Sequence, residues 1–398
     1  MTYRLLNENE IINYAVEKGL FNSTQGLSCE EIGDGNINYV FRVKSENKSY
    51  ILKQAHSLLR SSGRPLNQQR ADIEAFMLNY YNKTLPKYVP KLHYYDKELK
   101  LMIMEDLRDY KNLRMEYIKG NFYPHLSKAL GEFSVKSLLK SSYFYMDLKK
   151  FRRLQGLFIN DEMCDITEDL VLTEPYNDYR GRNVITKGLE DFVRENIYED
   201  RKLNLRVGLL KEKFVTQKQA LLHGDLHSGS IFVRGDLVKV IDPEFAVFGP
   251  MGYDLGNVLG HMFFGLIYNE KVKEDHNITK RIEGQIEDFI GEVFRNLKIY
   301  FYNNPVEDEM FNNPSYIKRK IKSIMADMYS YCGTEIIRRT IGDSQVLELT
   351  SIEDANLRIK MDRQILQFGK YLINSPESIN STNIIQIYHI WQNPSNSI

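Results

Sequence analysis

Two short stretches carry most of the information about the fold: Leu222-His-Gly-Asp-Leu-His-Ser-Gly-Ser230 and Ile241-Asp-Pro-Glu-Phe245. Between them, residues 231–234 and 238–241 have the apolar, β-branched character of strands, and Gly235-Asp236 is a turn signal, so a hairpin is predicted. Asp225 and Asp242, seventeen residues apart, then lie in the two loops that flank this hairpin. The sequence therefore predicts two acidic loops that are close in space.

Two acidic loops in this arrangement suit phosphoryl transfer. That reaction needs one carboxylate to accept or orient the proton of the attacking hydroxyl and another to hold Mg²⁺ against the phosphate oxygens. We assign the first role to Asp225 and the second to Asp242. Glu244 is a candidate ligand of a second Mg²⁺, because hard cations prefer carboxylate oxygens. Capping of turns and helices is the alternative role for each carboxylate alone, but the pair at this spacing favours catalysis.

The same segment contains two histidines, His223 and His227, which alternate with Asp225 and could suggest a metal-dependent hydrolase. Zinc hydrolases need three or four convergent ligands, and the other histidines of the chain are scattered in unrelated contexts. A hydrolase is therefore the weakest alternative. We expect both histidines to fix the loop through hydrogen bonds.

The region from Leu27 to Leu107 has the texture of short strands. Residues 39–43 and 50–54 are β-branched and aromatic with a turn between them, and residues 100–105 form another apolar strand. Apolar residues recur at three and four over 69–81, which predicts one main helix. Beyond Asp109, long helical patterns dominate, for example over 126–140 and 282–302.

This N-terminal region contains the parts that bind ATP in kinases. Gly33, Gly35 and Asn36 lie in a turn that enters a strand, where backbone N–H groups can approach phosphates, although alone such a turn is a weak signal. Lys53 lies on the next strand, and Glu74 follows twenty-one residues later on the predicted helix. A strand lysine held on the phosphates by a helix glutamate is what phosphoryl transfer in kinases requires.

Two further segments are candidate binding elements. Glu105, Asp106 and Leu107 end an apolar strand, and in a kinase-like fold their backbone groups would pair with adenine at the hinge. Arg338 and Arg339 lie on a predicted helix with unusually apolar neighbours, which indicates a partly buried pair able to bind substrate hydroxyls or phosphate. A solvated helix face is the ordinary alternative for such a pair.

Composition limits the possible locations and partners. The chain has 398 residues, and Lys plus Arg equals Asp plus Glu, 53 against 53, so no overall charge points to nucleic acid or to a membrane surface. Three widely spaced cysteines argue against a disulfide framework and a zinc site, and residues 1–20 lack the apolar core of a signal peptide. Residues 251–268 are apolar but include three polar side chains at helical spacing, which favours a buried helix. We expect a cytoplasmic protein.

These motifs resemble those of the bacterial S-methyl-5-thioribose kinase family, within the aminoglycoside-phosphotransferase and choline-kinase superfamily. The resemblance runs over nearly the whole chain and includes residues 33–41, 104–107, 223–231, 242–246 and 337–342. Asp-Pro-Glu at 242–244 and the twin arginine are the specific features. A tryptophan that the family carries between the strand lysine and the helix glutamate has no counterpart here, where Trp391 is the only tryptophan.

The resemblance implies an α+β, bilobal, protein-kinase-like fold, with a small antiparallel-sheet lobe over 1–107 ending in the hinge and a mostly helical lobe over 108–398. It implies Mg²⁺ and ATP as cofactors, with ATP contacts by Asn36, Lys53, the hinge, and Asp242, Pro243 and Glu244. It implies substrate contacts by Asp225 and by Arg338 or Arg339. The implied reaction phosphorylates the 1-hydroxyl of 5-methylthioribose in methionine salvage, and the implied assembly is a homodimer.

Two alternatives share this fold. The first is a kinase acting on another small hydroxyl acceptor, such as an aminoglycoside, choline or homoserine; the arginine pair argues against a polycationic aminoglycoside, because like charges repel. The second is a catalytically silent nucleotide-binding protein. Such proteins usually lose the lysine or an acidic residue, and Lys53, Asp225 and Asp242 are all present.

Overall fold

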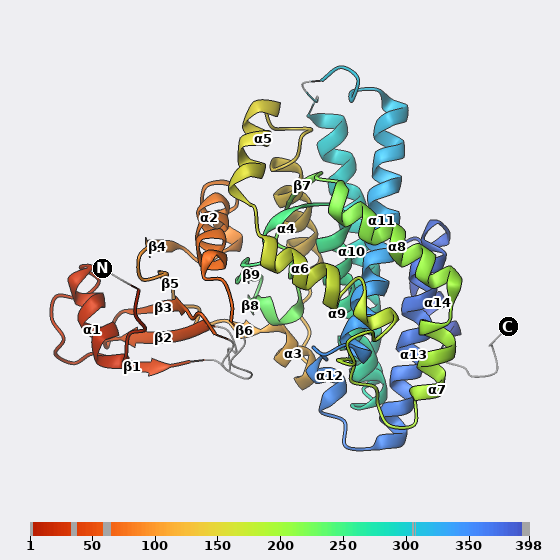
Figure 1. The fold of residues 1–398 in the computed structure, drawn as a ribbon, viewed down its shortest axis with the longest axis horizontal. Coiled ribbons are helices and arrows are strands. Elements are labelled where there is room, and N and C mark those ends of the chain that lie inside the picture. Colours follow the sequence, from red (N-terminus) through yellow and green to blue (C-terminus); the bar gives the residue numbers. More distant parts are fainter. Residues whose placement is uncertain (1–2, 33–37, 59–64, 305, 307, 392–398) are drawn as a thin grey trace.

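The computed structural model describes residues 3–32, 38–58, 65–304, 306 and 308–391. Its N-terminal part is a five-stranded antiparallel sheet in the order β1-β2-β3-β5-β4, which lies to one side of a larger helical part (Figure 1). The strands are β1 (Ser28–Glu31), β2 (Asn38–Lys44), β3 (Ser49–Ala55), β4 (Leu92–Asp96) and β5 (Leu101–Glu105). The predicted hairpin is β2–β3, and the predicted strand at 100–105 is β5.

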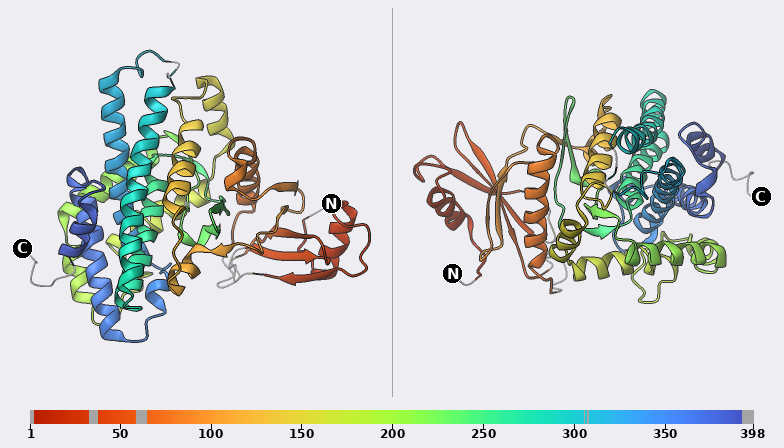
Figure 2. Two further views of the ribbon diagram at one scale, coloured as in Figure 1. Left: turned by 180° about the vertical axis from the view of Figure 1, so that it is seen from behind. Right: turned by 90° about the horizontal axis from the view of Figure 1, so that it is seen from above.

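The two faces of this sheet pack against different helices. Side chains alternate along a strand, so Leu52 packs with residues of α1 (Glu8–Glu17), whereas Ile51 packs with residues of α2 (Gln69–Thr84). The two helices lie on opposite sides of the sheet (Figure 2, right). Lys53 shares the face of Ile51 and is therefore directed toward α2, the predicted main helix. The alternation of β3 thus positions the lysine.

The rest of the chain, as far as the structure describes it, is mostly helical, as predicted, with five short strands. The helices are α3 (Leu113–Lys119), α4 (Leu126–Lys140), α5 (Leu148–Leu157), α6 (Asp161–Leu170), α7 (Glu190–Val193), α8 (Arg201–Thr216), α9 (Gly252–Lys271), α10 (His276–Asn303), α11 (Pro314–Ile341), α12 (Leu347–Thr350), α13 (Ala355–Asn374) and α14 (Ile384–Ile390). The strands are β6 (Lys111–Asn112), β7 (Ala220–Leu222), β8 (Ile231–Arg234), β9 (Leu237–Val240) and β10 (Val247–Gly249). Strands β8 and β9 form the predicted hairpin, to which β6 adds, and β10 pairs with β7.

Helix α9 is the centre of the helical part and is buried from Gly252 to Asn269, which confirms the buried helix predicted over 251–268. It packs closely on α11 because glycines face that helix: a Cβ on Gly256 would lie only 2.5 Å from the backbone nitrogen of Cys332. Within the described ranges, no helix is both long enough and apolar enough to cross a membrane.

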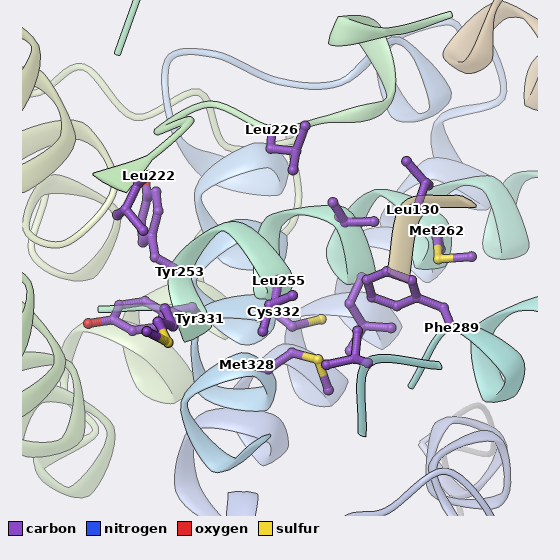
Figure 3. Close-up of a cluster of buried hydrophobic side chains, with 14 of the residues drawn as sticks. Leu130, Leu222, Leu226, Tyr253, Leu255, Met262, Phe289, Met328, Tyr331 and Cys332 are labelled. Atoms are coloured by element: carbon purple, nitrogen blue, oxygen red, sulfur yellow. The ribbon is translucent and has the colours of Figure 1, made fainter. Parts of the chain in front are cut away.

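The loop after β7 is anchored in this core. Figure 3 shows Leu222 and Leu226 directed toward a cluster of buried side chains that includes Tyr253 and Leu255 of α9. Leu226 is 1% exposed. Because Leu226 stands between Asp225 and His227, its burial fixes the backbone on which both polar side chains are mounted.

Candidate active site

The two acidic loops flank the β8–β9 hairpin as predicted. Asp225 lies between β7 and β8, and Asp242 follows β9 after one residue. Asp242 has a φ of +68°, in the left-handed region that non-glycine residues seldom adopt. Backbone conformations of this kind persist where the surrounding structure imposes them, often at functional sites.

The loop that carries Asp225 is held by buried polar contacts. The carboxylate of Asp254, on α9, accepts hydrogen bonds from the backbone nitrogens of His223 at 2.6 Å and Gly224 at 3.0 Å. The His223 Nε2–H donates to the carbonyl of Ile241 at 2.9 Å, which ties this loop to the strand end before Asp242. Gly224 has a φ of +86°, and a Cβ there would meet the Phe245 carbonyl oxygen at 2.2 Å, so glycine is required.

Three side chains converge on the Asp225 carboxylate. Arg338 and Arg339 each donate from Nη2 to its Oδ1 at 3.2 Å, and His227 Nε2 lies 3.3 Å from its Oδ2. His227 Nδ1 accepts from the backbone nitrogen of Gly229 at 2.9 Å, so the ring proton is on Nε2 and faces Asp225. The side chain of Asp225 remains 26% exposed, which leaves it accessible to a hydroxyl group.

These neighbours keep Asp225 ionised. Burial alone would raise the pKa of Asp225, but His227, Arg339 and Arg338 outweigh burial and hold that pKa well below its ordinary value. Burial also lowers the pKa of His227, so this ring is neutral at neutral pH despite the attraction of Asp225. At neutral pH the two guanidinium groups therefore supply the positive charge, and His227 supplies a hydrogen bond.

Glu335, one turn earlier on α11, positions the arginine pair by binding the same guanidinium groups that contact Asp225. The fully buried Glu335 carboxylate accepts from Arg338 Nε at 2.6 Å and from Arg339 Nε at 3.0 Å. His261, on α9, contacts the same carboxylate at 3.0 Å. The predicted burial of the pair is confirmed, and substrate binding by it stays a prediction.

A second cluster lies where α2 faces the Asp242 loop. Lys53 Nζ donates to both oxygens of Glu74 at 2.8 Å and also contacts Asp242 Oδ1. The predicted pairing of the strand lysine with the helix glutamate is thus present. Lys53 is buried and bridges the two carboxylates, which links the sheet to the hairpin of the helical part.

Glu244 completes this cluster. Its carboxylate accepts from Asn38 Nδ2 at 3.2 Å and lies 3.3 Å from Arg70 Nε. One oxygen each from Glu74, Asp242 and Glu244 can be chosen so that all three lie within 4.8 Å of one another. Burial, with repulsion from Asp242, raises the pKa of Glu244, and burial with the neighbouring carboxylates raises the pKa of Glu74 to about 8.

The donor set fits a divalent cation. Among the described residues, three carboxylates face one lysine and one arginine, so the formal negative charges outnumber the positive ones by one, and oxygen ligands are those that Mg²⁺ prefers. The raised carboxyl pKa values express the same excess of negative charge. A cation bound by Asp242 and Glu244 would relieve it.

The predicted hinge follows β5. The side chains of Glu105 and Asp106 have structural partners: Glu105 accepts from Lys239 Nζ at 3.2 Å, and Asp106 accepts from Arg42 Nε at 2.8 Å. The Leu107 carbonyl accepts from the Tyr110 nitrogen at 2.8 Å. Adenine binding by this backbone stays a prediction, as do the nucleotide contacts expected of the buried Pro243.

Part of the predicted nucleotide site lies outside the described residues. This applies to Gly33, Gly35 and Asn36, and to residues 59–64 of the segment in which the family tryptophan is missing.

Several residues of the site were not predicted as such. Glu335 precedes the arginine pair by three and four residues, and Arg70 precedes Glu74 by four, so helical spacing could have revealed both. Asp254 and His261 are two of the three polar side chains that interrupt the apolar stretch at 251–268, and no site role was predicted for them. Asn38 lies within the 33–41 motif but was given no role of its own, because its contacts with Glu244 and Arg70 depend on tertiary packing.

The site has three features of kinase-like phosphotransferases: a strand lysine paired with a helix glutamate, a loop aspartate held by two arginines, and a cluster of carboxylates. Together they define a phosphotransferase of the kinase-like class. In agreement, residues 28–276 match the model of the phosphotransferase enzyme family, APH. Methylthioribose kinase of Bacillus cereus is 38% identical over 94% of this chain and 93% of its own length. Methylthioribose kinase of Geobacillus kaustophilus is 36% identical over 93% of both chains. This chain belongs to the methylthioribose kinase family.

The solved structures that resemble this chain include choline kinase from Cryptosporidium parvum, with a TM-score of 0.48 and 13% identity over 90% of this chain and 94% of that one.

Proposed function

We propose that this protein transfers the γ-phosphate of Mg·ATP to the 1-hydroxyl of S-methyl-5-thio-D-ribose, forming S-methyl-5-thio-α-D-ribose 1-phosphate in methionine salvage. Family membership gives the reaction class and the acceptor. The observation that carries the proposal is that Asp225 contacts the arginine pair and lies in the loop before the β8–β9 hairpin, while Asp242 lies in the loop after it. In this reaction a bond forms between the sugar oxygen and the γ-phosphorus, and the bond from that phosphorus to the bridging oxygen of ADP breaks.

Asp225 is the proposed base. Its low pKa makes it a weak base, but it is ionised at every physiological pH and can accept the hydroxyl proton as the new bond forms. An anomeric hydroxyl is more acidic than an ordinary alcohol, so a weak base suffices. Most of the rate enhancement is then expected from positioning and electrostatic stabilisation, as in phosphoryl transfer generally.

Asp242 and Glu244 are the proposed ligands of Mg²⁺, and Lys53 is the proposed phosphate contact. When bound, the cation would neutralise charge on the phosphate oxygens. Lys53 would exchange its contact with Asp242 for one with the phosphates while it keeps its contact with Glu74. We assign the nucleotide site to the lobe 1–107 with its hinge backbone at 105–107, and the acceptor site to the lobe 108–398.

The charge of the acceptor site helps to decide which of the competing acceptors it can bind. The arginine pair was expected to repel a polycationic aminoglycoside. In the structure, however, its two charges are balanced by Asp225 and Glu335, so this repulsion is weaker than expected. A locally neutral site, rich in hydrogen-bonding groups, favours a neutral polyhydroxylated acceptor over choline or an aminoglycoside.

The test is an ADP-release assay with purified protein, Mg·ATP and four acceptors: methylthioribose, choline, homoserine and kanamycin. We expect kcat/KM for methylthioribose to exceed the others by at least about a hundredfold, since a site built for specific hydroxyl groups discriminates strongly. A preference for another acceptor would refute the substrate assignment and leave the phosphotransferase class intact.

Two further parts of the proposal concern the protein in the cell. We propose a homodimer in the cytoplasm, on the basis of family membership, the reducing environment suggested by the cysteine pattern and the cytoplasmic supply of ATP. Light scattering coupled to size exclusion measures the assembly, and a mass of one chain at micromolar concentration would contradict the dimer. Fractionation of cells that express the protein tests the location.

A further inference from the structure

Arg114 and Glu348 form a buried charged pair beside the acceptor site that the proposed mechanism does not use. Arg114 lies in the first turn of α3, and Glu348 lies on the short helix α12. Arg114 Nε and Glu348 Oε2 are 3.8 Å apart, which is an ion-pair distance but too long for a hydrogen bond. The two charges therefore attract each other, but no hydrogen bond joins the two side chains.

The unsatisfied atoms are numerous. Within the described part of the chain, Arg114 Nε and Nη2 and both carboxylate oxygens of Glu348 are buried and have no hydrogen-bond partner. A buried polar group without a partner loses its hydrogen bonds to water and gains none in return, so native proteins seldom leave several together unless something else binds there. The side chain of Glu348 is fully buried, whereas that of Arg114 is 21% exposed.

Arg114 is adjacent to the catalytic loop. A Cβ built on Gly229 would lie 3.3 Å from Arg114 Cζ, and Asn112, two residues before Arg114, donates from Nδ2 to the Gly229 carbonyl at 2.7 Å. Gly229 in turn donates to His227, which contacts Asp225. Arg114 therefore lies beside the loop that carries His227 and Asp225.

We propose that Arg114 is a substrate-binding residue that donates hydrogen bonds to a ring hydroxyl of the sugar, at the 2- or 3-position, and that Glu348 is a positioning residue that orients it. This inference rests on the proposed function and deepens it, because it names the groups of the acceptor that the site selects. Arg114 presents a planar set of donors, which suits the oxygens of neighbouring hydroxyl groups.

The charge of the pair favours a hydroxyl group over a phosphate group as its ligand. Glu348 neutralises Arg114, and a phosphate placed there would be repelled by Glu348 and by Asp225. A neutral polyol meets no such repulsion.

The experiment measures kcat/KM for methylthioribose and for its 2-deoxy and 3-deoxy analogues, with wild type, Arg114→Ala and Arg114→Lys. For the wild type, we expect at least one analogue to be about 10- to 100-fold poorer than the intact sugar, because Arg114 then loses its acceptor. For Arg114→Ala, kcat/KM for the intact sugar should fall by a similar factor, mainly through KM. In Arg114→Ala, the ratio of kcat/KM between the intact sugar and that analogue should shrink to about threefold or less.

Arg114→Lys keeps the positive charge but not the planar donor geometry, so the discrimination between methylthioribose and the deoxy analogue should fall in this variant too. This variant keeps the test valid if Arg114→Ala folds poorly. Arg234→Ala, at the exposed hairpin, is the matched control and should retain the wild-type discrimination. Glu348→Gln should weaken discrimination while the affinity for Mg·ATP, measured by calorimetry, is unchanged.

Unchanged discrimination in both Arg114 variants would overturn the proposal, as would a wild type indifferent to both deoxy positions. Failure of the wild type to phosphorylate intact methylthioribose would refute the proposed function instead. The two failures are distinguishable. The first is seen in the ratio of kcat/KM between methylthioribose and its deoxy analogues, and the second is seen as an absence of turnover with methylthioribose itself.

Discussion

Replacing Asp225 with asparagine tests the proposed base. The substitution keeps an oxygen that can accept from Arg338 and Arg339, but it removes the negative charge and places an NH₂ group opposite the Nε2–H of His227. No proton acceptor then remains at this position. General acid–base catalysis contributes about 10²- to 10⁴-fold, so we expect kcat to fall by about 10³-fold, equivalent to about 4 kcal/mol in the barrier.

The same substitution has predictable effects on binding and stability. No hydrogen bond or ion pair joins Asp225 to the carboxylate cluster around Lys53 within the described residues, so the Kd for Mg·ATP should change by less than about threefold. The arginine pair keeps Glu335 as a counterion, and we expect a loss of about 1–2 kcal/mol in the free energy of unfolding.

The assays are coupled ADP release for kcat, isothermal calorimetry for Mg·ATP and urea denaturation for stability. Asp236→Asn is the matched control, because it makes the same chemical change at the hairpin turn, where the side chain is 74% exposed. An Asp225→Asn enzyme that binds Mg·ATP normally and turns over within tenfold of the wild type would refute the role of Asp225 as base.

Three further predictions concern the metal site, pH and packing. Asp242→Asn should raise the Kd for Mg·ATP at least about tenfold by calorimetry, and an unchanged Kd would exclude Asp242 as a metal ligand. Burial holds the pKa of His261 well below its ordinary value despite the contact with Glu335, so below about pH 6.5 the unfolded chain binds more protons at this position than the native protein. Stability in urea should therefore fall by about 1 kcal/mol from pH 6.5 to 5.5, and His261→Gln should flatten that slope if the histidine causes it. Gly256→Ala should destabilise the protein by about 1–3 kcal/mol through overpacking between α9 and α11. Gly284→Ala, where a Cβ meets nothing within 4 Å, should stabilise α10 by about 0.5–1 kcal/mol, and equal effects of the two substitutions would contradict the packing argument.

Much of the fold was predictable because its signals are local. The β2–β3 and β8–β9 hairpins follow from alternation and turn residues within about fifteen residues, and α2, α4 and α9 follow from helical periodicity. Strands β1, β4, β7 and β10 were not individually predicted. All four are short. Strands β1 and β4 bury too few side chains to show an apolar alternation, and β7 pairs with β10 across the whole β8–β9 hairpin, which periodicity does not encode.

In the candidate site, too, some features were predictable from local sequence and others depend on tertiary packing. Lys53, Glu74, Asp225, Asp242 and Glu244 were identified because each lies at a characteristic place on its own element. Arg338 and Arg339 were recognised as candidates through the family motif and their apolar surroundings.

The contacts that give these residues their properties come from packing. Asp225 contacts arginines more than a hundred residues away, and its low pKa results from their charges together with His227. Arg114 and Glu348 had no sequence signal, since each is an ordinary charged residue on a short helix until α3 packs beside the catalytic loop and α12 packs on α9. Local sequence therefore specifies which groups are available, and the packing of α9, α11 and α12 specifies which of them meet, because electrostatic and hydrogen-bond energies depend on distance in space rather than along the chain.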